Sequence, residues 1–315
     1  MNLTYVLEVA LAVLVLGAAF WTIVAHSAFS SAVGFVSYGL LLSLVWVQLA
    51  AVDVALTEAA IGSGLTGVLL LSAAATLRAT EGTSGAGPGP AMRVAAAICC
   101  GFVTVAVAAV VLTLPEPSPT LAPEVVAALP ATGVGNPVTG VLMAFRALDT
   151  LLEKVVLVLA LIGVWSFAPD RYWGGHPGLS HRLSADGVLP FFARTLPPLG
   201  VLLGIHLMWT GADAPGGAFQ GGTVLAAMWL LVMMAGVRDA PAIRERWLRL
   251  ALVSGPVVFL AVGLVGMLAA GAFLAYPVAI AKPLILLIEV PMLLTIALAL
   301  GLLVAGPPER TAQSS

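Results

Sequence analysis

The sequence predicts an all-α, polytopic membrane protein with about nine transmembrane helices. Of its 315 residues, 61% are hydrophobic and only 9% are charged, whereas soluble domains carry about 25% charged residues. The mean hydropathy is +1.10. Apolar runs of about twenty residues recur along the chain, and each is long enough to cross a bilayer core of about 30 Å.

This prediction is based on nine apolar segments. The first contains Glu8 and lacks the basic stretch of a signal peptide, so we expect it to be retained as a span. Longer connections are expected at residues 81–90, 115–137 and 168–187. The expected spans lie near residues 3–25, 28–50, 53–77, 93–114, 138–167, 188–210, 216–236, 248–274 and 279–305.

The arginines predict how the chain is oriented. They flank the connections after the third, fifth, seventh and ninth expected spans, as in the basic run from Arg238 to Arg249. The connections on the opposite side contain carboxylates but no lysine or arginine. The positive-inside rule therefore predicts a multi-pass protein of the cell (inner) membrane, with its N-terminus outside and its C-terminus in the cytoplasm.

The third span contains the glycine spacing G-x-G-x-x-G at Gly62, Gly64 and Gly67. A dinucleotide fingerprint requires a preceding strand and a helix N-terminus presented to water, whereas these glycines lie inside an apolar run. We expect them to permit close helix packing and to loosen the helix. No nucleotide or nucleic acid is an expected partner.

Two carboxylates precede these glycines in the same span. An ionisable group inside a span is costly and usually marks a proton or ion path, so Glu58 is a candidate for such a path. Asp53 lies at the predicted outer end of the span. It is either part of the path or a carboxylate that stabilises a helix N-terminus.

The fifth span has the densest group of charges, at Arg146, Asp149, Glu153 and Lys154. The first three are spaced three and four residues apart, so they share one helical face. Lys154 is rotated by about 100° from Glu153 and points toward a different neighbour. Charges of both signs can exchange partners as protons move, so this group is a candidate for the ion path. The alternative is that the group is a static set of ion pairs that fixes helix packing.

Further candidates lie in the sixth and ninth spans. Lys282 and Glu289 are seven residues apart and so share one face. Lys282 can snorkel to the outer interface, whereas Glu289 is deeper, beside Pro291. His206 could titrate near neutral pH or serve as a structural histidine. No metal site and no cofactor are expected.

The connection between the sixth and seventh spans is rich in glycine. Its turn signal is Pro215-Gly216, and we expect a tight re-entry of the chain into the membrane. Irregular backbone at that depth must be buried in protein or wetted. The residues expected to form this structural motif are Pro215, Gly216, Gly217, Gly221 and Gly222.

Three stretches resemble known families. The stretch from Asp53 to Gly62 resembles the signature of the D-type subunit of membrane-bound hydrogenases, a module also found in the C-terminal part of the Mrp large subunit. The stretch from Asn136 to Glu153 is similar to the companion E-type subunit. The stretch from Gly211 to Gly222 resembles the B-type subunit of Mrp antiporters. The implied modules are residues 1–92 (D-like), 93–170 (E-like), 171–187 (a cytoplasmic connection) and 188–315 (B-like).

This resemblance implies a subunit of a multisubunit Na⁺/H⁺ antiporter, a transporter rather than an enzyme. The implied partners are other Mrp-type subunits, both antiporter-like large subunits and small membrane subunits, together with Na⁺, H⁺ and the lipid bilayer. The chain would contribute to the ion path rather than exchange ions alone. Two alternatives remain open: the ion-translocating subunit of a redox-driven complex such as a membrane-bound hydrogenase, and a structural scaffold subunit.

Overall fold

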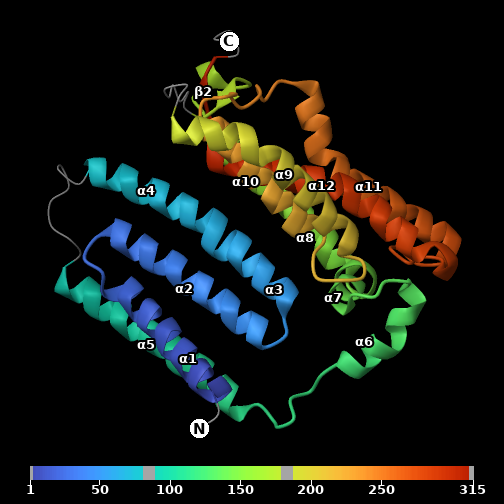
Figure 1. Cartoon of the computed structure of the whole chain (residues 1–315), viewed down its shortest axis with the longest axis horizontal. Helices are drawn as coiled ribbons and strands as arrows, with labels where there is room; N and C mark the ends of the chain where they lie inside the picture. The colour runs from blue at the N-terminus through green and yellow to red at the C-terminus, as the bar shows by residue number, and fades with distance from the viewer. Residues whose placement is uncertain (1–2, 81–88, 179–186, 312–315) are drawn as a thin grey trace.

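The computed structural model describes residues 3–80, 89–178 and 187–311, and most of this part of the chain is helical (Figure 1). The predicted class, an all-α polytopic membrane protein, is confirmed. Within the described residues there is a single small sheet, in which β1 (His176–Pro177) pairs antiparallel with β2 (Pro308–Arg310). This sheet fixes the C-terminal end of the chain to the connection that follows the fifth expected span.

The N-terminal part forms a small bundle of apolar helices. At its centre α2 packs against α1 and against the third expected span, which is broken into three helical segments. Most of its apolar side chains are exposed, as expected of a bundle that faces lipid or other subunits. Its elements are α1 (Leu3–Val24), α2 (Ala28–Gln48), α3 (Val52–Thr57), the π-helix η1 (Glu58–Leu65) and α4 (Thr66–Thr80).

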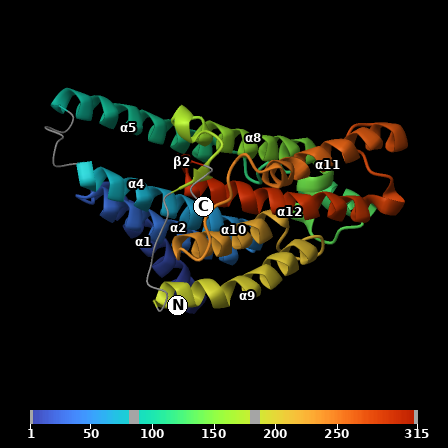
Figure 2. The same ribbon diagram turned by 90° about the horizontal axis from the view of Figure 1, so that it is seen from above.

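The C-terminal part forms a larger bundle around α12. Figure 2 shows α12 between α8 and α11 on one side and α10 and α9 on the other. Ile285, Ile288 and Ile296 of α12 are fully buried, because a helix that is apolar on every side is stable only when it is surrounded. The helices are α8 (Ala147–Trp165), α9 (Val188–Thr210), α10 (Ala218–Met234), α11 (Arg246–Ala270) and α12 (Ala281–Ala305).

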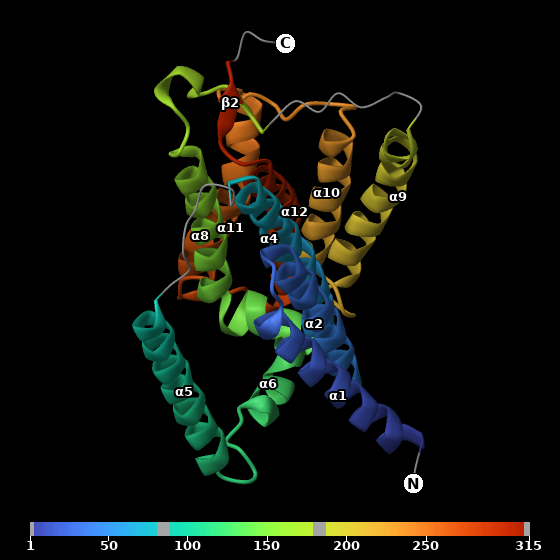
Figure 3. The ribbon, with the colours of Figure 1, turned by 90° about the vertical axis from the view of Figure 1, so that its left-hand side faces the viewer.

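The two bundles meet where α10 contacts α3 and η1. The helix α5 (Pro90–Thr113), by contrast, has no buried residue and stands apart from both bundles (Figure 3). The expected loop at 115–137 contains short helices that lead from α5 into the larger bundle. The remaining short elements are α6 (Ala122–Ala128), η2 (Leu129–Thr132), α7 (Pro137–Gly140), the π-helix η3 (Val141–Phe145), η4 (Asp170–Tyr172) and η5 (Val278–Ile280).

The number of spans agrees only roughly with the expected nine. Each expected span coincides with helical structure, but seven segments of the described residues are long and apolar enough to cross a membrane, or eight if a bent pair counts as one span. That pair, Ala122–Thr132 and Pro137–Phe145, bends by 85°. The fifth expected span is broken and charged, and the seventh contains a helix of only 17 residues.

Helix α10 lies close to α12 because Gly222 has no side chain. A Cβ added there would lie 2.8 Å from two side-chain atoms of Ile296. We therefore expect Gly222→Ala to destabilise the bundle by about 1–3 kcal/mol, the usual range for an overpacked core, and to lower the melting temperature of the detergent-solubilised protein. The matched control is Gly17→Ala in α1, where an added Cβ meets nothing within 4 Å. Equal melting temperatures for the two variants would contradict this account of the contact.

Candidate functional site

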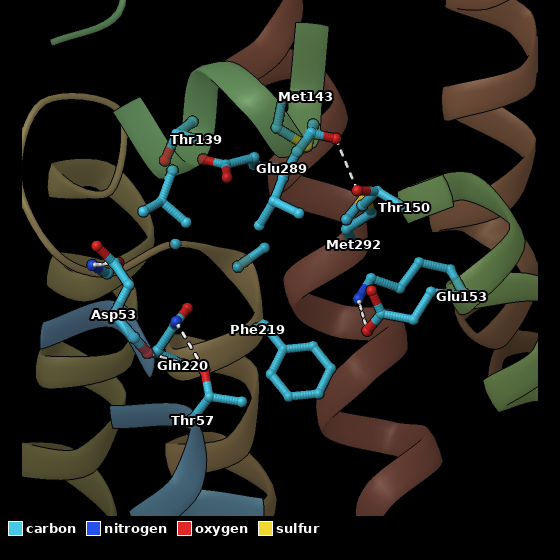
Figure 4. Close-up of a pocket in the computed structure, with 16 residues that line it drawn as sticks. Asp53, Thr57, Thr139, Met143, Thr150, Glu153, Phe219, Gln220, Glu289 and Met292 are labelled. Atoms are coloured by element: carbon cyan, nitrogen blue, oxygen red, sulfur yellow. Dashed lines mark hydrogen bonds and ion pairs between the residues drawn. The ribbon is translucent and has the colours of Figure 1, made fainter. Parts of the chain in front are cut away.

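A cavity of about 170 Å³ lies where the two bundles meet (Figure 4). We call it the junction cavity. A water molecule occupies about 30 Å³ of the liquid, so the cavity has room for several. Hydroxyl and amide groups of Thr57, Thr139, Thr150 and Gln220 contribute to its wall. Its titratable lining residues are Asp53, Glu153, Lys154 and Glu289.

Asp53 connects three parts of the chain that are distant in sequence. Its Oδ1 accepts a hydrogen bond from the backbone N–H of Gly216 at 2.9 Å, and its Oδ2 accepts one from the Asn136 side-chain amide at 3.4 Å. The same amide also donates to the carbonyl oxygens of Gly211 and Ala214. Asp53, predicted either as a path residue or as a helix-end carboxylate, therefore lies at the junction of all three parts and is buried there.

The glycine-rich turn brings the start of α10 to the cavity wall. Gly216 and Gly217 have φ values of 151° and 124°, which residues with a side chain rarely adopt. A Cβ at Gly221 would overlap the carbonyl oxygen of Gly204 in α9. The irregular backbone is thus packed inside the protein, as its depth in the membrane requires. Pro215 lies in the same turn.

Glu289 enters the cavity from α12, and its side chain is one of those labelled in Figure 4. Only 4% of the residue is exposed. The carboxylate accepts a hydrogen bond from the backbone N–H of Ala218, the first residue of α10. Within the described residues its Oε2 atom has no hydrogen-bond partner. Since an unpaired buried polar atom costs about 1–3 kcal/mol, this oxygen is suited to binding a proton, a water molecule or a cation.

Lys154 of α8 lines the same cavity as Glu289. It is the largest fully buried side chain of the described residues, with 2% exposed. Its ammonium group is 2.7 Å from Oε1 of Glu153 and 4.4 Å from the ring centroid of Phe219. The ion pair and the cation–π contact compensate part of the cost of burying the charge. Glu153 differs from Lys154 because 52% of its side chain is exposed on the outer face of the chain.

Two π-helical segments border the cavity. Such segments are rare and frequently occur at functional sites. The first, η1, starts at Glu58, just after the lining residue Thr57. The second, η3, supplies Met143 and Leu142 to the wall, and the Leu142 carbonyl oxygen accepts a hydrogen bond from the Thr150 hydroxyl at 2.6 Å. The helix loosening expected after Glu58 thus takes the form of a π-helix.

Glu58 itself lies outside the junction cavity. Its carboxylate fills the space left by two glycines, since a Cβ at Gly62 would overlap its Oε1 and a Cβ at Gly39 of α2 would lie 2.9 Å from it. Ser63 is buried beside Gly39, and its hydroxyl has no hydrogen-bond partner within the described residues. Gly64 and Gly67 lie further along the span, where Gly67 packs against Val36 of α2.

A hydrogen bond links the cavity to the residue that precedes Glu58. The Gln220 side-chain amide donates to the Thr57 hydroxyl at 3.2 Å. The structure therefore contains two acidic positions, Glu58 on the α2 side and the junction cavity on the α10 side, and Thr57, which precedes Glu58 in the chain, lines the cavity.

Several other predicted residues lie away from the cavity. Arg146 and Asp149 form an exposed ion pair of 2.6 Å at the start of α8. Lys282 pairs with Asp213 at 2.6 Å rather than with Glu289. His206 is exposed on α9, where its carbonyl oxygen accepts a hydrogen bond from Thr210.

The ion pair of Lys282 and Asp213 joins the start of α12 to the connection between α9 and α10. The hydrogen bonds from Lys282 hold the pKa of Asp213 below its ordinary value of 3.8. A lowered pKa means that the pair stabilises the fold above that value and that this contribution is lost in acid. Both groups are partly exposed, so we expect Lys282→Met to cost at most about 1 kcal/mol at neutral pH and nothing in strong acid. Thermal melts of both proteins across pH would measure this, and a difference that grows in acid would contradict it.

Some site residues were not predicted as functional. Asn136, Thr139 and Thr150 were not identified as candidates, although Asn136 stands before Pro137 and caps α7 by accepting a hydrogen bond from the Val138 N–H. Asparagine followed by proline is a known helix-start signal that could have revealed its position. Nothing in the local sequence indicates that its amide also reaches Asp53.

The fold and the cavity together define a polytopic membrane protein with charged groups buried between its helices, an arrangement typical of ion-translocating subunits. Residues 188–307 match the family described as a domain related to the MnhB subunit of Na⁺/H⁺ antiporter, and residues 13–79 match the MbhD family, the D-type subunit of MBH. The predicted resemblance to the B-type subunit of Mrp antiporters and to the D-type subunit of membrane-bound hydrogenases is confirmed.

Two solved structures share the fold. A chain in the structure of the Mrp complex from Dietzia sp. superposes with a TM-score of 0.74 and 22% identity, over 96% of this chain and 35% of that chain. A chain of the membrane-bound sulfane sulfur reductase, an archaeal respiratory membrane complex, superposes with a TM-score of 0.55 and 23% identity, over 67% of this chain and 95% of that chain.

A curated relative is an uncharacterized protein of Methanocaldococcus jannaschii. It is 30% identical over 156 residues, which cover 45% of this chain and 60% of the relative. This chain thus spans less than two thirds of that relative and about a third of the Mrp chain it resembles.

Proposed function

We propose that the chain is an ion-path subunit of a multisubunit monovalent cation/proton antiporter, acting with other Mrp-type subunits rather than alone. The observation that carries this proposal is the junction cavity. Three carboxylates and one ammonium group line a space large enough for water, between helices that are otherwise apolar. Groups so costly to bury at membrane depth are retained where ions or protons pass. The MnhB-related domain and the likeness to the Mrp complex support the same function.

The proposed path includes Glu153, Lys154 and Glu289 in the cavity, with Glu58 as a second acidic position. Asp53 holds the parts of the chain together at this site, and Arg146 and Asp149 lie on the outer face of α8. That face carries charges at membrane depth, so it requires a polar neighbour. We propose that another subunit of the complex covers it.

We further propose that the N-terminus lies outside and the C-terminus in the cytoplasm. The two ends of the described chain lie at opposite ends of the molecule (Figure 3). Arg238 and Arg244 lie in the connection from α10 to α11, and Arg246 and Arg249 lie in the first turn of α11, at the same end as β2. The positive-inside rule places that end in the cytoplasm. A cysteine introduced at Ser118 should then react with membrane-impermeant reagents added outside intact cells.

Purification through a tag on this chain tests the main proposal. We expect antiporter-like large subunits and small membrane subunits to co-purify, and the reconstituted assembly to exchange Na⁺ for H⁺ in liposomes. A monodisperse single-chain preparation with full exchange activity would contradict the proposal that the chain acts with partners.

A second candidate is the ion-translocating subunit of a redox-driven membrane complex. The likeness to a chain of the sulfane sulfur reductase favours it at the level of the fold. The same purification distinguishes the two candidates, because iron–sulfur subunits in the assembly would support the redox-driven complex. A purely structural role is tested by the charge-neutralising variants described below.

A further inference from the structure

The junction cavity is lined by more carboxylates than ammonium groups. The titratable groups that face it are Asp53 from α3, Glu153 and Lys154 from α8, and Glu289 from α12, and α10 adds none. Asp53 already uses both carboxylate oxygens in hydrogen bonds. The cavity therefore contains two further carboxylates, Glu153 and Glu289, for one ammonium group, and Lys154 is paired with Glu153.

The two candidate partners of Lys154 differ in their surroundings. Glu153 is half exposed on the outer face of the chain, so an ion can reach it from a neighbouring subunit or from water. Glu289 is almost completely buried, and its Oε2 has no partner within the described residues. Such an oxygen is satisfied if the carboxyl group carries a proton, or if a cation comes to it.

We propose that Lys154 is a movable counter-ion that couples cation arrival at Glu153 to proton release from Glu289. A monovalent cation binds the Glu153 carboxylate and releases the Lys154 ammonium group. The ammonium group crosses the cavity and pairs with Glu289, whose carboxyl group gives its proton to cavity water. Lys154 stays protonated throughout. One cation enters and one proton leaves, so the net charge around the cavity is unchanged.

The surroundings of Lys154 suit this movement. A lysine side chain is a point charge on a flexible four-carbon stem, and the ring of Phe219 offers the ammonium group a favourable surface beside the Glu153 position. The cavity has room for several water molecules, which can carry the released proton away. The inference rests on the proposed function, and it adds to it the residue that links the two ions.

Infrared difference spectroscopy tests the inference without measuring transport. The complex that contains this chain is reconstituted, and spectra are recorded with and without Na⁺. We expect Na⁺ to remove a band of a protonated carboxyl group, and Glu289→Gln to abolish that change. The change should also be lost in Glu153→Gln, where no carboxylate receives the cation, and in Lys154→Met, where no ammonium group can move. Glu116→Gln, in the exposed connection between α5 and α6 and outside the cavity lining, is the control and should respond as the wild type does.

Three results would overturn the inference: a wild-type spectrum without the Na⁺-dependent band, a band that persists in Glu289→Gln, or an unchanged response in Lys154→Met. The wild-type and Glu289→Gln spectra decide the matter even if another variant fails to assemble. Exchange measured in vesicles separates this inference from the proposed function. If exchange is lost in Glu153→Gln but the Na⁺-dependent spectrum does not involve Glu289, the proposed function is supported. The proposed coupling through Lys154 is then refuted.

Discussion

Glu153→Gln is expected to abolish Na⁺/H⁺ exchange by the assembled complex while leaving assembly intact. Glutamine keeps the size and hydrogen-bonding capacity of the side chain but removes its charge. The fully buried ammonium group of Lys154 then loses the carboxylate that lies 2.7 Å away, and the exposed end of the proposed path loses its ion-binding group. Everted membrane vesicles with a pH-sensitive dye would measure the exchange.

Glu116→Gln is the matched control for this experiment. Glu116 lies in the exposed connection between α5 and α6 and touches no part of the cavity lining, so its neutralisation should leave exchange at the wild-type rate. Glu58→Gln should reduce exchange as Glu153→Gln does, if the second acidic position belongs to the path. Wild-type exchange in both Glu153→Gln and Glu58→Gln, across pH, would identify these glutamates as packing residues and favour the scaffold alternative.

Asp53→Ala is expected to cause the largest loss of stability. The carboxylate accepts hydrogen bonds from Gly216 and Asn136, and its removal leaves the buried N–H of Gly216 without an acceptor. Each buried donor left unpaired costs about 1–3 kcal/mol, and here the lost hydrogen bonds are ones that connect the two bundles. We expect a lower melting temperature in detergent and faster proteolysis between α9 and α10.

Glu8→Ala serves as the control for Asp53→Ala, because Glu8 is an exposed carboxylate on α1 and should tolerate the change. The isosteric variant Asp53→Asn separates the two predicted roles of Asp53. A stable Asp53→Asn protein that no longer exchanges ions would place the carboxylate in the path. A destabilised one, with the exchange of the surviving complexes intact, would define it as the connection between parts of the chain.

Much of the fold follows from features that are local in the sequence. Apolar runs locate the spans because the bilayer sets their length. Glu289 and Lys154 were recognised as candidates because a charge inside such a run is costly wherever the helix packs. The same reasoning identified the glycine turn before α10, since Pro215-Gly216 is a turn signal in any context.

The remaining features depend on contacts between distant residues. Asp53 binds Asn136 and Gly216, which lie 83 and 163 residues further along the chain, and no local pattern indicates such partners. The π-helices insert one extra residue into a turn, which hydrophobic periodicity does not resolve. Lys282 was grouped with Glu289 by helical spacing, but Asp213 from a separate connection is the partner that it reaches.

The isolation of α5 has a practical consequence. Both cysteines of the chain, Cys99 and Cys100, lie on this helix and are exposed. A thiol-reactive spin label or fluorophore soluble in lipid therefore attaches to α5 without any engineered mutation. The native chain thus contains its own spectroscopic reporter of what surrounds α5, whether detergent, lipid or a neighbouring subunit.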